Sequence, residues 1–156
     1  MSGRALFLPF IVALLFASCT GGADPVAPDY AILPVSQGPA LIQQCSRESP
    51  ADVSGFWRPS HSEVQAIERR LPEFLRKSGR KIDLSASRRQ YIGIRLGRRK
   101  LIYVNAFPAS ELAFLSGDGE WRTIAFTVCA GGEAFWGVEF DPAGNTFHRI
   151  GFNEVA

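Results

Sequence analysis

The chain has 156 residues, of which 46% are hydrophobic and 21% are charged, and its formal net charge at pH 7 is +2. This length and composition are typical of one globular domain with its own core, and they argue against two domains. The small net charge hides an uneven distribution. Residues 69–100 carry twelve basic and two acidic side chains (+10), whereas the rest of the chain carries five basic and thirteen acidic ones (−8).

Residues 1–18 have the organisation of a secretory signal peptide. A short basic segment, Met1–Arg4, precedes an apolar run of twelve residues, Ala5–Phe16, and the small residues Ala17 and Ser18 follow. The run is shorter than the about 20 apolar residues that a transmembrane helix needs. We therefore expect this segment to be a signal peptide.

The end of this segment, Leu15–Cys19 with the sequence LFASC, resembles a bacterial lipobox. The resemblance implies cleavage before Cys19 and attachment of lipid to this cysteine, which would anchor the mature chain in a membrane. Thr20, and not an aspartate, follows the cysteine. The resemblance then implies the periplasmic side of the outer membrane. The alternative is an ordinary secretory signal that has a cysteine near its cleavage site.

The chain has three cysteines. An exported protein usually pairs its cysteines in an oxidising compartment, so Cys45 and Cys129 are expected to form a disulfide if Cys19 carries lipid. These two cysteines and the two histidines, His61 and His148, lack the spacing of a zinc site. We expect neither a metal nor a cofactor.

Residues 19–44 are rich in glycine and proline and are predicted to be a flexible, mostly extended tether, which places the globular domain at residues 45–156. Apolar residues between Ile32 and Ile42 could still dock on the domain. If Cys129 ends a strand on the face away from the helix, its disulfide would bring this segment to that face.

A helix is predicted to start at Ser60, because Ser60 and Glu63 have the spacing of a capping box. Apolar residues follow at helical spacing, and Gly79 is suited to end the helix. Pro72 interrupts the pattern, so we expect a kink or break near Leu71.

Alternating residues over Tyr91–Phe107 predict a β-hairpin. With a three-residue loop at Gly97–Arg99, Ile94 would face Ile102, giving one aliphatic face for the helix. Further on, we expect a short helical turn and three strands. Their ranges are 108–115 for the turn and 121–129, 134–140 and 146–152 for the strands.

These elements predict an α+β fold with one kinked helix packed on an antiparallel sheet of four to five strands. The order of elements over Ser54–Asn153 resembles the cystatin-like architecture. The cystatin inhibitor motif is absent, since Gln90–Gly93 is only distantly similar to it. Patterns at Arg89–Tyr91, Ile102–Phe107 and Cys129–Asp141 also resemble small bacterial lipoproteins of unassigned role.

Basic residues at the helix end and the hairpin tip form the candidate site for an anionic envelope component or an envelope protein. They are Arg76, Lys77, Arg80, Lys81, Arg98, Arg99 and Lys100. The alternative is a solvated surface. Binding of nucleic acid is not expected of an exported chain without a recognition motif.

No pattern of catalytic residues accompanies the charges, so the sequence predicts a non-enzymatic binding or structural domain. An inhibitor of a secreted enzyme, or a chaperone-like module, is the alternative function.

Overall fold

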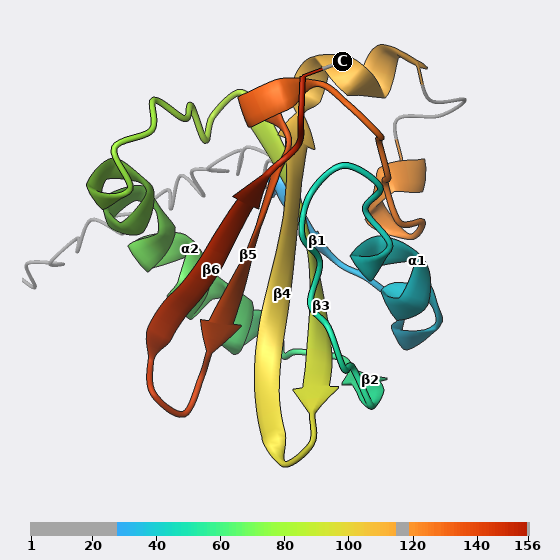
Figure 1. Cartoon of the computed structure of the whole chain (residues 1–156), viewed down its shortest axis with the longest axis vertical. Coiled ribbons are helices and arrows are strands. Elements are labelled where there is room, and N and C mark those ends of the chain that lie inside the picture. Colours follow the sequence, from blue (N-terminus) through green and yellow to red (C-terminus); the bar gives the residue numbers. More distant parts are fainter. Residues whose placement is uncertain (1–27, 115–118, 156) are drawn as a thin grey trace, which may run out of the picture.

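The computed structural model describes residues 28–114 and 119–155. In these residues one main helix, α2 (His61–Lys77), packs against a mixed sheet of six strands, so the predicted α+β class is confirmed (Figure 1). The strands are β1 (Tyr30–Ile32), β2 (Gly55–Trp57), β3 (Ser87–Leu96), β4 (Arg99–Pro108), β5 (Trp136–Asp141) and β6 (Thr146–Phe152). The short helices are α1 (Gly38–Ile42) and the 3-10 turns Val35–Gln37, Ala109–Phe114, Glu120–Arg122 and Gly132–Ala134.

The strand order is β1-β3-β4-β5-β6, and β2 also pairs with β3. β1 runs parallel to β3 at Arg89–Tyr91, and β2 runs antiparallel to β3 at Gly93–Arg95. These two short strands, which the sequence did not predict, therefore share one edge of β3. β5 and β6 match the expected last strands, and the predicted turn after β4 is the 3-10 turn at Ala109–Phe114. The cystatin-like resemblance stays a prediction.

The start and end of α2 agree with the sequence. Ser60 Oγ accepts a hydrogen bond from the Glu63 amide, and a Glu63 carboxylate oxygen accepts one from the Ser60 amide, which completes the capping box. Gly79, with φ of 76°, follows the helix end. The helix is continuous through Pro72, so the predicted break near Leu71 is wrong, and the alternative of a kink there stays a prediction. Packing of the apolar side of α2 on the sheet holds the two halves in one helix.

The β3–β4 hairpin forms, but its predicted register is wrong by one residue. Its loop has two residues, with Gly97 at φ of 60°, so Ile94 pairs with Leu101 and Gly93 with Ile102. A glycine at the first position of a two-residue loop favours this tight turn. Because side chains alternate along a strand, the shift moves Ile92 and Ile94 to the face opposite Ile102.

Both faces of the sheet are therefore covered. Residues Val64, Ile67, Leu71 and Leu75 of α2 pack on one face. Figure 1 shows α1 and the chain that follows it on the other side of the sheet. There, Leu33 and Leu41 are fully buried with Ile92, Ile94, Leu101 and Tyr103.

The described part of the predicted tether, residues 28–44, is thus part of the fold, and the prediction of a flexible tether is wrong there. β1 and α1 lie in this range, and the apolar residues between Ile32 and Ile42 dock on the sheet as the alternative proposed. Residues 19–27 of the predicted tether, and the signal peptide, lie outside the described residues.

The predicted disulfide between Cys45 and Cys129 is present, and its chain segment covers the face away from α2. Residues 121–129, however, do not form the predicted strand. Their backbone groups bond to side-chain amides in place of a neighbouring strand. The Gln90 Nε2 donates to Trp121 O (2.6 Å) and Ile124 O (2.7 Å), and Gln90 Oε1 accepts from Phe126 N (2.9 Å).

The close packing of Trp57 on β3 gives a test of this arrangement. A Cβ added at Gly93 would overlap the Trp57 ring, whereas one added at Gly55 would meet only Arg95 Cδ at 3.6 Å. We expect Gly93→Ala to lower the free energy of unfolding by about 1–3 kcal/mol, the usual cost of overpacking. Gly55→Ala is the matched control. Equal denaturant midpoints for the two variants would contradict the packing described.

Candidate functional site

The structure places the seven predicted basic residues, all of them exposed, in two separate groups. One group lies in the last turn of α2 and the loop that follows it, and the other lies at the β3–β4 turn. Figure 1 shows these two places at opposite ends of the sheet. Because β3 has ten residues, each adding about 3.3 Å, its two ends lie roughly 30 Å apart. They cannot form one continuous patch.

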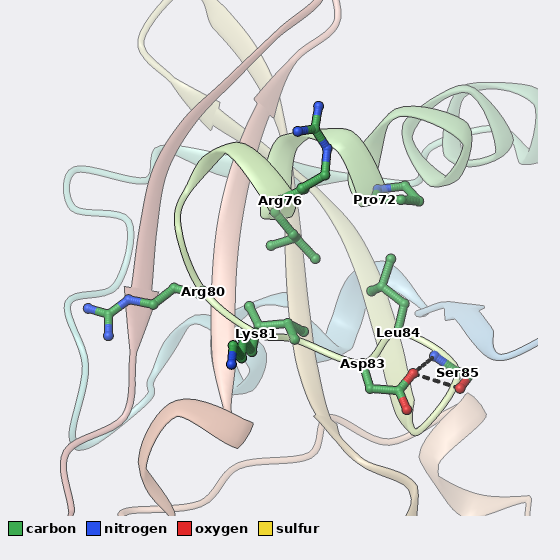
Figure 2. Close-up of a pocket in the computed structure, with 9 residues that line it drawn as sticks. Pro72, Arg76, Arg80, Lys81, Asp83, Leu84 and Ser85 are labelled. Atoms are coloured by element: carbon green, nitrogen blue, oxygen red, sulfur yellow. Dashed lines mark hydrogen bonds between the residues drawn. The ribbon is translucent and has the colours of Figure 1, made fainter.

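The first group borders an open groove with a volume of about 620 Å³, which we call the α2-end groove. Its lining comes from the last turns of α2 and the loop that leads to β3 (Figure 2). The lining residues are Pro72, Leu75, Arg76, Arg80, Lys81, Ile82, Asp83, Leu84 and Ser85. The groove therefore combines apolar side chains with three cations and one carboxylate.

Two of these cations are available to a ligand. In the described residues no carboxylate lies within 4.0 Å of the charged nitrogens of Arg76 or Lys81. Arg80 is already engaged, because its guanidinium pairs with Glu133 and lies 5.1 Å from the centre of the Phe152 ring.

The one carboxylate of the groove is held by its own loop. Asp83 Oδ1 accepts hydrogen bonds from Ser85 N (2.9 Å) and Ser85 Oγ (2.6 Å), as Figure 2 shows. The Ser85 hydroxyl and amide lower the pKa of Asp83 below its usual value. Asp83 is thus an ionised turn-forming residue whose oxygen is occupied by Ser85. The groove keeps an excess of positive charge, which suits an anionic ligand.

Lys77, the remaining member of the first group, lies outside the lining. Its Nζ is 2.7 Å from a Glu73 carboxylate oxygen one helical turn away, and both side chains are largely exposed. An exposed pair of this kind contributes little to stability.

The second group borders a smaller groove of about 420 Å³ at the hairpin tip, the tip groove. It is lined by Trp57, Glu63, Arg98, Arg99, Lys100, Asp141, Pro142 and Ala143. Arg99 lies 3.4 Å from an Asp141 oxygen, and the Lys100 Nζ lies 5.3 Å from the centre of the Trp57 ring. Arg99 and Lys100 thus each have an acidic or aromatic neighbour, whereas Arg98 has no ion pair in the described chain.

A partly buried ion pair fixes α2, and with it the α2-end groove, to the sheet. Arg89 Nε and Nη2 donate to the two Glu68 carboxylate oxygens at 2.7 and 2.9 Å. The Tyr91 hydroxyl donates to the same carboxylate. Such a two-pronged bond sets the orientation of the helix as well as its distance from the sheet.

Neither histidine lies in the α2-end groove. His61 is exposed at the start of α2, and His148 is exposed on β6, with its Nε2 3.8 Å from an Asp141 oxygen. Within residues 28–114 and 119–155, no three His, Cys, Asp or Glu side chains gather as metal ligands would. No helix in the same ranges has the length and apolar character needed to cross a bilayer.

Sequence reasoning found the cations of the α2-end groove but missed its apolar lining. Ile82 and Leu84 alternate with charged residues in a loop, a pattern that indicates partial burial although the loop has no regular structure. Comparison of the chain with protein-family models, curated proteins and solved structures gives no match.

The environment of Tyr91 gives a pH test of the helix attachment. Burial, reinforced by Glu68, raises the pKa of Tyr91 well above 10, so the folded protein favours the neutral phenol. The stability from this group is complete below pH 10 and is lost as the pH rises through the pKa of the folded state. We expect the free energy of unfolding to fall above pH 10, and Tyr91→Phe to make that fall shallower by up to about 1.4 kcal/mol per pH unit. The free energy of unfolding of both proteins is measured by chemical denaturation at several pH values above 10. Equal slopes of this free energy against pH would contradict the prediction.

Proposed function

We propose that this protein is an exported, lipid-anchored domain without enzymatic activity that binds an anionic envelope component in the α2-end groove. The anchor is Cys19, and the location is the periplasmic side of the outer membrane. The observation that carries the binding role is the pair of cations, Arg76 and Lys81, beside a carboxylate that Ser85 already holds.

The disulfide supports export. Disulfides persist in oxidising compartments and are rare in the cytosol, so the Cys45–Cys129 bond indicates an extracytoplasmic domain. The third cysteine is left without a partner by this pairing, which agrees with the lipobox-like segment that ends at Cys19. Lipidation would use that cysteine and leave no free thiol.

The charge distribution supports an anionic partner over an apolar one. Arg99 of the tip groove lies 3.4 Å from an Asp141 oxygen, whereas no carboxylate in the described chain lies within 4.0 Å of the charged nitrogens of Arg76 or Lys81. An arginine presents a fork of donors that matches phosphate, sulfate or carboxylate oxygens, and a lysine adds a mobile charge.

The anchor is tested by a mass spectrum of the protein isolated from the membranes of its own cells, before and after reduction. We expect the chain to begin at Cys19 with added diacylglyceryl and acyl groups, and to gain two hydrogens when Cys45 and Cys129 are reduced. An unlipidated Cys19 would overturn the proposed anchor.

The groove is tested by binding the detergent-solubilised full chain to dextran sulfate, a soluble polyanion. We expect Arg76→Gln with Lys81→Gln to weaken binding by about tenfold, equivalent to about 1.4 kcal/mol, and rising salt to weaken the wild type steeply. Arg98→Gln with Lys100→Gln removes the same charge at the tip and is the matched control. Equal losses in the two double variants would mean that net charge, and not the groove, binds the polyanion.

A further inference from the structure

We propose that the α2-end groove faces the membrane that holds Cys19, and that its anionic ligand is the headgroup of a phospholipid in that membrane. This inference rests on the proposed lipid anchor. It follows from where the described chain begins, how far it lies from Cys19, and what lines the groove.

The described chain begins at the same end of the sheet as the groove. The Arg89 amide donates to Asp29 O at 3.1 Å, and Arg88 pairs with the Asp29 carboxylate at 2.8 Å. Ser85, a residue of the groove wall, lies directly before β3. Figure 1 shows the start of β1, the start of β3 and the loop after α2 at one end of the sheet, with the β3–β4 turn at the other.

The distance to the anchor is short. Nine residue steps separate Cys19 from Pro28, and an extended chain spans at most about 3.3–3.6 Å per residue, so the connection reaches roughly 30 Å at most. The length of β3 puts the hairpin tip roughly 30 Å farther from the point of attachment. The membrane is therefore within easy reach of the α2-end groove and at the limit of reach for the tip groove.

The lining of the groove matches a phospholipid headgroup. Figure 2 shows the Arg76 and Lys81 side chains pointing in different directions, so each supplies donors for a phosphate of its own, and Leu75, Ile82 and Leu84 supply apolar surface for the carbons nearby. Two of the nearby carboxylates are paired, Glu133 with Arg80 and Asp29 with Arg88, and the positive charges of Arg76 and Lys81 outnumber the one negative charge of Asp83.

Anchoring also removes the need for strong intrinsic affinity. A groove tethered beside a membrane meets headgroups at a high effective concentration, so a weak site is occupied without further contacts. This explains why two unpaired cations in an open groove are sufficient. The same two cations on an untethered protein would bind a single headgroup only weakly.

The test is hydrogen exchange on the lipidated full chain, placed in vesicles of phosphatidylcholine with or without phosphatidylglycerol. We expect the amides of residues 78–86, which lie outside regular elements over most of this range, to exchange severalfold more slowly when phosphatidylglycerol is present. The amides of residues 96–100 at the hairpin tip are expected to keep their rates.

Arg76→Gln with Lys81→Gln is expected to abolish the slowing, and Arg98→Gln with Lys100→Gln to preserve it. Slowing at the hairpin tip, or equal rates for residues 78–86 in both kinds of vesicle, would overturn the inference. The lipidated chain could give one of these contrary exchange results and still bind dextran sulfate through Arg76 and Lys81. The proposed function would then stand, and the headgroup would not be its ligand. An unlipidated Cys19 would overturn both.

Discussion

The Arg47 guanidinium is buried on the face of the sheet that α2 leaves uncovered, and the arrangement of that face depends on it. Its nitrogens donate to the Tyr103 hydroxyl at 3.1 and 3.3 Å, to Asn153 Oδ1 at 3.0 Å and to Asn105 Oδ1. No carboxylate in the described chain lies within 4.0 Å of it. A buried charge costs several kcal/mol unless polar partners surround it, so these neutral oxygens must be held in place.

The neighbours of Arg47 meet that requirement and extend the network. Asn153 Nδ2 donates to the carbonyls of Val128 and Ala130, both at 2.9 Å, and Asn105 Nδ2 donates to Gln90 Oε1 at 3.2 Å. One polar network thus joins β3, β4, the residue after β6 and the chain around Cys129. The Cys45–Cys129 disulfide places Arg47, two residues from Cys45, over this network. Covalent and polar constraints act on the same segment.

This network explains which parts of the fold could be predicted from the sequence. Features encoded locally were predicted correctly, namely the capping box at Ser60 and the β5–β6 hairpin. The Cys45–Cys129 disulfide joins residues 84 apart and was predicted from the number of cysteines. Residues 121–129 alternate in hydrophobicity as a strand does. They do not pair with a neighbouring strand, because the side-chain amides of the distant Gln90 and Asn105 bond to their backbone carbonyls. Local alternation cannot distinguish a backbone that bonds to another strand from one that bonds to buried amides.

The register of the hairpin failed for a related reason. Both faces of β3 and β4 are buried, so either pairing would bury aliphatic side chains, and hydrophobic pattern alone does not choose between them. The turn determines the register, because Gly97 allows a two-residue loop. The prolines of residues 28–44 favoured an extended tether, although Leu33 and Leu41, within the apolar segment that was expected to be able to dock, are fully buried.

The candidate site was predictable in composition but not in arrangement. Counting charge along the chain put Arg98 and Arg76 in one basic region, yet the fold sends them to opposite ends of a ten-residue strand. The neighbours of the cations differ as well, because Arg99 lies beside Asp141 and Lys100 beside Trp57, whereas no carboxylate in the described chain lies within 4.0 Å of Arg76 or Lys81. The early start of the fold at β1 shortens the connection to Cys19. Burial of the segment that contains β1 and α1 is thus what brings one basic group near the proposed anchor and keeps the other away from it.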